Sequence, residues 1–221
     1  MKRILALVEG QTEEGFVREV LAPTLELWIS ARILGVPGHK GGIRPWDRVR
    51  KELISLLRED RDAVVTTCFD YFRLPTSFPG KATIVAADPP AAKAAKLEAA
   101  MLDAIALELG ESWNRGQLVP YIQMHEFEAV LFSDPVRFAS GVGLPGLAAS
   151  FQRIRGQFES PEHINDGATT APSKRIEAIV TGYIKPLHGL VGALEIGLPA
   201  MRAECSHFAA WVERLEQVGK K

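Results

Sequence analysis

The sequence predicts an α/β protein: a parallel sheet flanked by helices, followed by a helical C-terminal addition. Short apolar runs of strand length recur in the first 134 residues, and stretches with helical spacing separate them. Strands that alternate with helices are typical of parallel sheets. From about residue 135 the helical stretches are separated by Gly and Pro, without another strand-like run. We therefore expect an α/β core over 1–134 and a helical addition over 135–221 that packs on it.

The first strand is expected over residues 3–8, where a short apolar run ends at Glu9. A helix should follow, with Thr12 as its N-cap and two acids in its first turn, where the helix dipole favours them. Pro23 predicts a kink in this helix, because proline removes a backbone donor. Residues 32–36 are expected to form the next, short strand.

The remaining elements of the core follow from the same patterns. Apolar residues at helical spacing predict a helix around 49–57, and the β-branched run over 63–69 predicts the clearest strand. The alanine-rich stretch 90–109 is strongly helical in composition. Residues 118–123 are expected to form another strand, and His125 should begin a short helix.

The composition excludes several classes of protein. The chain has 221 residues and a formal net charge of −1, so any binding of nucleic acid needs a local basic patch. The two cysteines, Cys68 and Cys205, are far apart and show neither metal-site spacing nor a disulfide framework, which fits a reducing cytoplasm. The apolar run after Met1 is too short for a signal peptide, and no stretch reaches membrane-spanning length. We expect a cytoplasmic protein that does not associate with membranes.

Acidic residues follow three of the expected strands. Glu9 and Asp70 each end an apolar strand, and Glu126 and Glu128 follow a third. In a parallel sheet these ends lie at one edge, where ligands bind in open α/β folds. Carboxylates that share a site resist ionising together, so such clusters commonly hold a divalent cation. The sequence therefore predicts a Mg²⁺ or Mn²⁺ site formed by these four acids. The alternative is that each of them caps a helix or a turn.

The segment from His125 to Glu128 allows two arrangements. On a helix, positions 125 and 128 share a face while position 126 points elsewhere. Either His125 and Glu128 face the cleft together, or Glu126 faces it alone, and we favour Glu128 slightly as the metal ligand. His125 would then contact the substrate, or alternatively form a hydrogen bond at the helix start. The spacing is not His-Glu-x-x-His, which argues against a zinc protease.

Magnesium at such a site commonly binds substrate phosphates, and positive charge from Lys or Arg helps to stabilise them. Pro172 opens a helix whose first turn contains Lys174 and Arg175, against the dipole preference for acids. A bound phosphate or a nearby carboxylate would offset this unfavourable placement. We expect Lys174 to stabilise the phosphate, and Arg175 and Asn165 to contact the substrate. The alternative is a solvated basic pair.

Four segments of the chain together resemble a family of bacterial Toprim-like proteins of unknown function. The Toprim fold is shared by topoisomerases, DnaG-type primases and overcoming-lysogenization-defect nucleases. The segments are Val8 to Glu13, Asp70 to Pro75, His125 to Ala129 with Leu131 to Asp134, and Ile164 to Asp166 with Ala171 to Arg175.

The resemblance implies a Toprim-like, Rossmannoid core in which Glu9 acts as general acid or base. Asp70 would be the first member of an Asp-x-Asp pair that binds Mg²⁺. Phe72 stands where the second aspartate is expected, and we hypothesise that Glu126 or Glu128 supplies the lost ligand.

The resemblance further implies a Mg²⁺-dependent phosphoryl-transfer enzyme, most simply a nuclease acting on DNA or RNA. It also implies a partner ATPase and a role in anti-phage defence. The alternative is a Toprim-like nucleic-acid-binding or regulatory module without catalysis, which the missing second aspartate and the near-zero net charge favour.

Overall fold

The structure is a computed structural model that describes residues 2–35, 45–72, 74–165 and 167–220. Its strands are β1 (Ile4–Val8), β2 (Ile29–Ile33), β3 (Val64–Asp70), β4 (Leu118–Val119) and β5 (Ile122–Gln123). Its α-helices are α1 (Gln11–Phe16), α2 (Ala22–Leu25), α3 (Trp46–Glu59), α4 (Pro90–Leu109), α5 (Pro135–Gly141), α6 (Ala148–Arg155), α7 (Pro172–Glu177), α8 (Lys185–Ile196), α9 (Leu198–Glu204) and α10 (Ser206–Gly219). A π-helical turn, η1 (Val17–Leu21), joins α1 to α2, and the 3₁₀ helices are η2 (Lys81–Thr83), η3 (Arg115–Gln117), η4 (Phe127–Ser133), η5 (Pro145–Leu147) and η6 (Pro161–His163).

The sheet is parallel throughout, which confirms the expected α/β class. Its order is β2-β1-β3-β4. Strand β5 also pairs with β3, closer to the C-terminal end of β3 than β4 does. The expected strand over 118–123 is divided in two because Pro120 has no N–H to give to the ladder. Side chains bridge the gap: the hydroxyl of Thr66 donates to the Val119 carbonyl over 2.6 Å, and that of Thr67 donates to the Tyr121 carbonyl over 2.9 Å.

Most of the expected elements of the core are present. The runs 3–8 and 63–69 form β1 and β3, and the stretch 90–109 forms α4. The strand expected over 32–36 is wrong in its bounds, since β2 covers Ile29–Ile33 and residue 36 lies outside the described residues. Beyond residue 135, the described residues form helices and no strand, as expected.

The first helix differs from the prediction at both ends. Gly10 is its N-cap and Gln11 its first residue, so Thr12 lies inside the first turn and is buried there. The chain stays helical through Pro23, which occupies the first turn of α2 directly after η1. A change in the hydrogen-bonding pattern ahead of a proline accommodates its missing N–H without ending the helix.

Two hydrophobic cores cover the two faces of the sheet. Helices α3 and α4 supply the apolar residues over one face, together with Leu7, Val65 and Phe69 of the strands. The other face, which carries Ile4 and Val64, packs against α1, η1 and α10. This second core continues without interruption into η4, α5, α6, α8 and α9, so the C-terminal helices share the core of that sheet face.

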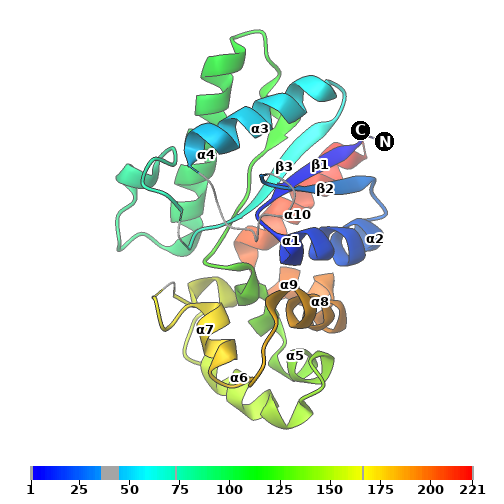
Figure 1. The fold of residues 1–221 in the computed structure, drawn as a ribbon, viewed down its shortest axis with the longest axis vertical. Helices are drawn as coiled ribbons and strands as arrows, with labels where there is room; N and C mark the ends of the chain where they lie inside the picture. The colour runs from blue at the N-terminus through cyan, green and yellow to red at the C-terminus, as the bar shows by residue number, and fades with distance from the viewer. Residues whose placement is uncertain (1, 36–44, 73, 166, 221) are drawn as a thin grey trace.

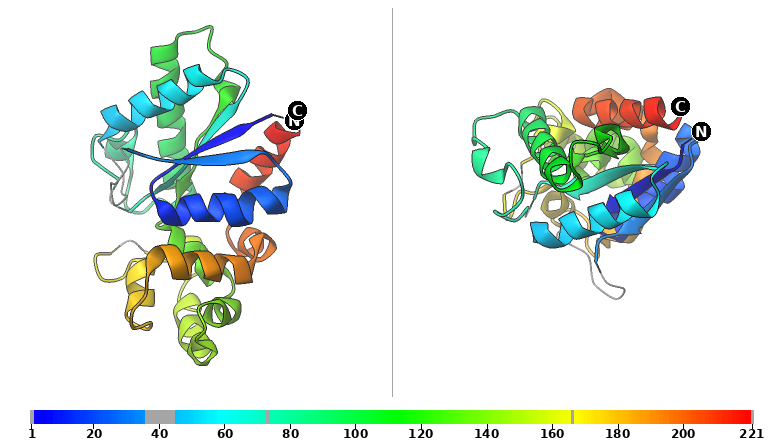
Figure 2. Two further views of the ribbon diagram at one scale, coloured as in Figure 1. Left: turned by 45° about the vertical axis from the view of Figure 1, so that its right-hand side comes forward. Right: turned by 90° about the horizontal axis from the view of Figure 1, so that it is seen from above.

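Figure 1 shows the arrangement that results, with the sheet and α3 in the upper half and α5 to α8 in the lower half. The chain returns to the sheet through α10, and the two termini lie side by side in both views of Figure 2. The backbone N–H of Lys2 accordingly donates to the carbonyl of Gly219 over 3.2 Å. None of the described helices is long and apolar enough to span a membrane.

Trp211 fixes α10 to the sheet. Its indole N–H donates to the hydroxyl of Thr66 on β3 over 2.9 Å, and its ring stacks on Tyr121 with a centroid distance of 4.3 Å. Stacked aromatic pairs stabilise more than their buried area alone would suggest, and a buried indole N–H needs a partner. The C-terminal helix is therefore held by one directional bond and one large apolar contact.

We predict that Trp211→Phe lowers the free energy of unfolding by about 1–2 kcal/mol, because it removes the indole donor but keeps a ring. Urea unfolding of the purified protein measures this. Trp28→Phe is the matched control, since Trp28 is 67% exposed and the change there should stay within about 0.5 kcal/mol. An equal loss in both variants would contradict the assignment of Trp211 as an anchor.

Candidate metal centre

The ends of β1 and β3 place two acids at one edge of the sheet. Val8 lies opposite Cys68 in the parallel register, so Glu9 comes level with the end of β3. The backbone N–H of Asp70 donates to Oε1 of Glu9 over 2.7 Å. The two acids that sequence analysis selected from separate strands are thus joined directly. Glu9 is anchored by the main chain of the residue whose carboxylate lies in the cluster described next.

A second pair of acids reaches the same place from the end of β5. One carboxylate oxygen from each of Asp70, Glu126 and Glu128 lies within 4.8 Å of the other two. We call these three residues the acidic cluster. Two backbone donors hold it: the N–H of Phe127 donates to Oδ1 of Asp70 over 2.8 Å, and that of Ser173 donates to Oε2 of Glu126 over 2.9 Å.

The segment 125–128 differs from both sequence-based arrangements, because Glu126 and Glu128 reach the cluster together. The helix does not begin at His125. Glu126 is extended, with φ −137° and ψ 160°, and the 3₁₀ helix η4 starts only at Phe127. The helical-face argument therefore does not apply to position 126. An extended residue followed by a tight helical turn lets side chains two positions apart converge.

Lys185, at the first position of α8, is the described cation that pairs with the cluster. Its ammonium nitrogen lies 2.9 Å from Oε2 of Glu128 and 3.7 Å from Oε1 of Glu126. The Glu128 side chain is fully buried, and its carboxylate accepts no well-directed hydrogen bond from the described residues. The ion pair with Lys185 is therefore its main polar contact.

Small residues allow α8 to bring Lys185 this close. Helix α8 packs across α1, and a Cβ atom at Gly189 would lie 2.9 Å from the methyl carbon of Thr12. On the facing helix, a Cβ atom at Gly15 would lie 3.3 Å from Leu190. Larger side chains at these two positions would move the helices apart. The closeness of the two helices thus sets the position of the ammonium.

Burial and like charge raise the pKa values of the acids. Burial raises the pKa of Asp70 well above its usual range, and the charges of Glu9 and Glu13 raise it further. Burial also raises the pKa of Glu128 to about 7, even though the Lys185 ammonium acts in the opposite direction. Burial alone would lower the pKa of Lys185, but Glu128, Asp70 and Glu126 outweigh it and raise that pKa. Among the described residues, several acids at the site thus share the ammonium of Lys185.

The residues present fit a divalent cation. Carboxylate oxygens are the ligands of hard cations, and a spread of 4.8 Å is close to twice a metal–oxygen distance of about 2.0–2.6 Å. Glu128 gives independent support for a bound cation, because its Oε1 is buried without a hydrogen-bond partner among the described residues. Asp70, Glu126 and Glu128 can therefore hold a metal ion. Glu9 does not belong to this set of three, and it reaches the cluster through the main chain of Asp70.

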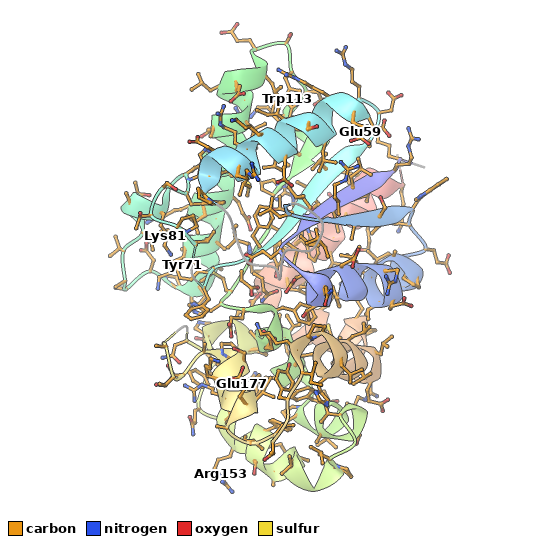
Figure 3. All side chains as sticks on the ribbon, viewed as in Figure 1. Glu59, Tyr71, Lys81, Trp113, Arg153 and Glu177 are labelled. Carbon is orange, nitrogen blue, oxygen red and sulfur yellow. The ribbon has the colours of Figure 1, made fainter. Side chains whose placement is uncertain are left out.

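The three residues expected to contact the phosphate or the substrate lie on α7 or just before it, and each has a partner within the protein. Lys174 forms an ion pair of 2.6 Å with Glu177, which Figure 3 labels on α7. Arg175 donates to the side-chain oxygen of Asn165 over 3.0 Å and lies over the ring of Phe158. Asn165 and Arg175 are thus brought together. Contact of these three residues with a substrate stays a prediction.

The aromatic residues beside Asp70 mainly cover the end of the sheet. Tyr71 is buried and packs edge-on against the ring of His125, which is also buried. The ammonium of Lys81 also contacts the ring of Tyr71 and lies 3.6 Å from its centroid, on the left of Figure 3. Phe78 is buried against Trp46. His125 therefore has a packing role in the structure, and its contact with a substrate stays a prediction.

Sequence reasoning missed Lys185, Glu13 and Tyr183. Glu13 is buried in the first turn of α1, and burial raises its pKa, while Lys185 lowers it. The hydroxyl of Tyr183 is buried without a hydrogen-bond partner among the described residues, and the charges of Glu128 and Glu126 act on it. A signal for Lys185 existed: it is a lysine in the first turn of a helix, the unfavourable placement that drew attention to Lys174.

The fold and the site define a class: an α/β protein with a parallel sheet, whose carboxyl edge carries a buried acidic cluster paired with a lysine. The chain belongs to the family described as domain of unknown function (DUF4276), whose sequence model matches residues 8–216. That span includes every residue of the site. Searches of curated proteins and of solved structures gave no match. The family description carries no activity, and the likeness to Toprim proteins stays a prediction.

We predict that the metal-free protein loses stability as the pH rises from about 5 to about 8. The pKa of Glu128 in the folded protein, about 7, exceeds its ordinary value of 4.5. Its contribution is therefore complete below pH 4.5 and is lost as the pH rises through 7, by about 3 kcal/mol at most.

Glu128→Gln should flatten this pH profile, because an amide does not titrate. Urea unfolding at a series of pH values, with a chelator present, measures both proteins. His207, whose pKa is raised by its hydrogen bond to Glu98 against the effect of burial, changes stability in the same direction in both proteins. The difference between the two profiles therefore isolates the acidic cluster, and parallel profiles would refute the prediction.

Proposed function

We propose that this protein is a Mg²⁺- or Mn²⁺-dependent phosphoryl-transfer enzyme of Toprim-like type, and specifically a nuclease that cleaves phosphodiester bonds in DNA or RNA. One observation carries the proposal. Three carboxylates from two strand ends converge within 4.8 Å at the carboxyl edge of a parallel sheet, with a lysine beside them. Carboxylates at this edge are the usual means by which α/β proteins hold Mg²⁺ and a phosphate together.

The ligand set supports the part of the proposal that concerned the missing aspartate. Phe72 occupies the second position of the Asp-x-Asp pair and offers no oxygen. Glu126 and Glu128 bring two carboxylates to Asp70 from the neighbouring strand end. Their convergence supports the hypothesis that these glutamates replace the lost ligand. The lost position would thereby be compensated within the same edge of the sheet.

Each residue of the site has a proposed task. Asp70, Glu126 and Glu128 would hold the cation, which when bound would neutralise charge on a phosphoryl oxygen. Glu9 would exchange a proton with the attacking or leaving oxygen, because its carboxylate is fixed beside the cluster by the Asp70 N–H. Lys185 is placed to supply the positive charge that we expected from Lys174, whose ammonium pairs with Glu177. Lys174 remains a candidate for contact with a more distant phosphate.

A second candidate function is a Toprim-like nucleic-acid-binding or regulatory module without catalysis. The ion pair between Lys185 and Glu128 favours it, because an ammonium can compensate buried carboxylates without any metal. The two candidates differ in what a divalent cation does to the protein. An enzyme of the proposed kind needs the cation, whereas the module would bind nucleic acid equally well in a chelator.

A partner ATPase and a role in anti-phage defence belong to the proposal on the strength of the family resemblance alone. The chain would then act in the cytoplasm as the effector of a two-component system. Co-purification with the product of a neighbouring ATPase gene is the direct test of this partner. The absence of nuclease activity in the isolated chain, with activity in the complex, would be the expected result if the ATPase controls the site.

We predict that Mn²⁺ binds to the wild-type protein and supports cleavage of plasmid, single-stranded DNA or RNA. Asp70→Asn should weaken Mn²⁺ binding at least about tenfold, because it removes one charged ligand. Glu126→Gln and Glu128→Gln should weaken it as well. Glu9→Gln should keep Mn²⁺ binding and lower the cleavage rate by roughly 10²–10⁴-fold, as the loss of a general acid or base does. Calorimetric titration and gel assays measure the two effects.

Glu59→Gln is the matched control for these carboxylate-to-amide changes. Glu59 lies far from the cluster at the upper end of the molecule in Figure 3, where it forms an exposed ion pair with Arg32. Glu59→Gln should therefore leave Mn²⁺ binding and nucleic-acid cleavage unchanged. The enzyme proposal fails if millimolar-range Mn²⁺ does not bind, and the module is favoured if nucleic acid binds regardless of the cation.

A further inference from the structure

Lys185 differs from the acids around it in its exposure to solvent. The side chains of Glu128 and Glu126 are 0% and 5% exposed, while that of Lys185 is 38% exposed. Lys185 begins α8, and the ammonium at the end of its side chain reaches two of the three carboxylates of the cluster. The lysine is therefore the solvent-exposed member of this ion-paired group.

In the part of the chain that the structure describes, three clustered carboxylates share one ammonium. Each of Asp70, Glu126 and Glu128 brings a carboxylate oxygen to within 4.8 Å of the other two. One ammonium carries a single positive charge and contacts Glu128 and Glu126. Among the described residues, no other cation is paired with the cluster. A divalent cation at this place would offset the repulsion among the three carboxylates.

From this arrangement we infer that Lys185 is a tethered counter-ion, which a divalent cation displaces when it binds to Asp70, Glu126 and Glu128. The inference rests on the proposed metal site and adds to it a rule for which ions the site accepts. The ammonium already contacts the carboxylates of Glu128 and Glu126, so the ion would compete with it for two of its three ligand residues. Binding of the ion and the ion pair of Lys185 with Glu128 then exclude each other.

Competition with a tethered lysine selects ions by charge. A monovalent ion gains no more Coulomb energy from the carboxylates than the ammonium that it would replace, and it must come from solution. A divalent ion doubles that attraction at the same distance. Sodium and potassium should therefore fail to displace Lys185, whereas Mg²⁺ and Mn²⁺ should succeed. The lysine keeps the cluster partly compensated until such an ion arrives.

The test is the affinity for Mn²⁺ alone, measured by calorimetric titration at about pH 8, above the pKa of about 7 that Glu128 has in the folded protein. Lys185→Met removes the competing ammonium and keeps the length of the side chain. We expect it to bind Mn²⁺ at least about tenfold more tightly than the wild type. Lys96→Met is the matched control, because Lys96 forms a 2.7 Å ion pair with Asp88 at a distant site, and its affinity should stay unchanged.

A second variant covers the case in which Lys185→Met does not fold. Lys185→Arg keeps the charge and can hold a carboxylate with two donors, so Mn²⁺ should bind equally or more weakly than to the wild type. Unchanged or weaker binding to Lys185→Met, or tighter binding to Lys185→Arg, would overturn the inference. If the wild type binds no Mn²⁺ but Lys185→Met does, the counter-ion role stands and the proposed metal-dependent function fails.

Discussion

The parallel register of β1, β3 and β5 forces carboxylates together at one edge of the sheet, and much of the remaining structure compensates the repulsion that results. Three backbone donors and one ammonium do this work. The N–H groups of Asp70, Phe127 and Ser173 each hold one carboxylate, and Lys185 pairs with Glu128. Ser173 belongs to α7 and Lys185 to α8. The helices that follow the sheet in the chain thus supply the charge compensation that the sheet edge lacks.

The parts of the site that could be predicted are those that depend on neighbouring residues in the chain. An apolar run that ends in an acid identifies both a strand and its end, so Glu9 and Asp70 followed from the pattern alone. Helix α4 was predicted to the residue, because alanine-rich composition and flanking Pro and Gly define its bounds. The two glutamates near residue 127 were selected because they follow a strand, although the helical-face argument placed only one of them toward the cleft.

The parts that could not be predicted depend on packing between distant segments. The helical-face argument failed at Glu126 because the chain stays extended there and the helix begins only at Phe127. Lys185 lies more than fifty residues from the nearest acid of the cluster, and its position follows from the close packing of α8 on α1 at Gly15 and Gly189. Sequence spacing contains no record of that contact. The same holds for Trp211, whose indole reaches Thr66 across the molecule.

The cluster itself argues for a function other than stability. A buried ion pair is poor evidence of a stabilising role, since apolar residues of similar volume commonly stabilise a core as well or better. Here the cluster lies beside an apolar core that continues through η4 and α8. Glu128 is fully buried with one oxygen unpartnered among the described residues, next to two further acids. Elevated pKa values of this kind concentrate where proteins bind ions or move protons. An arrangement that costs stability in the absence of a cation is what a site built to take up a cation requires.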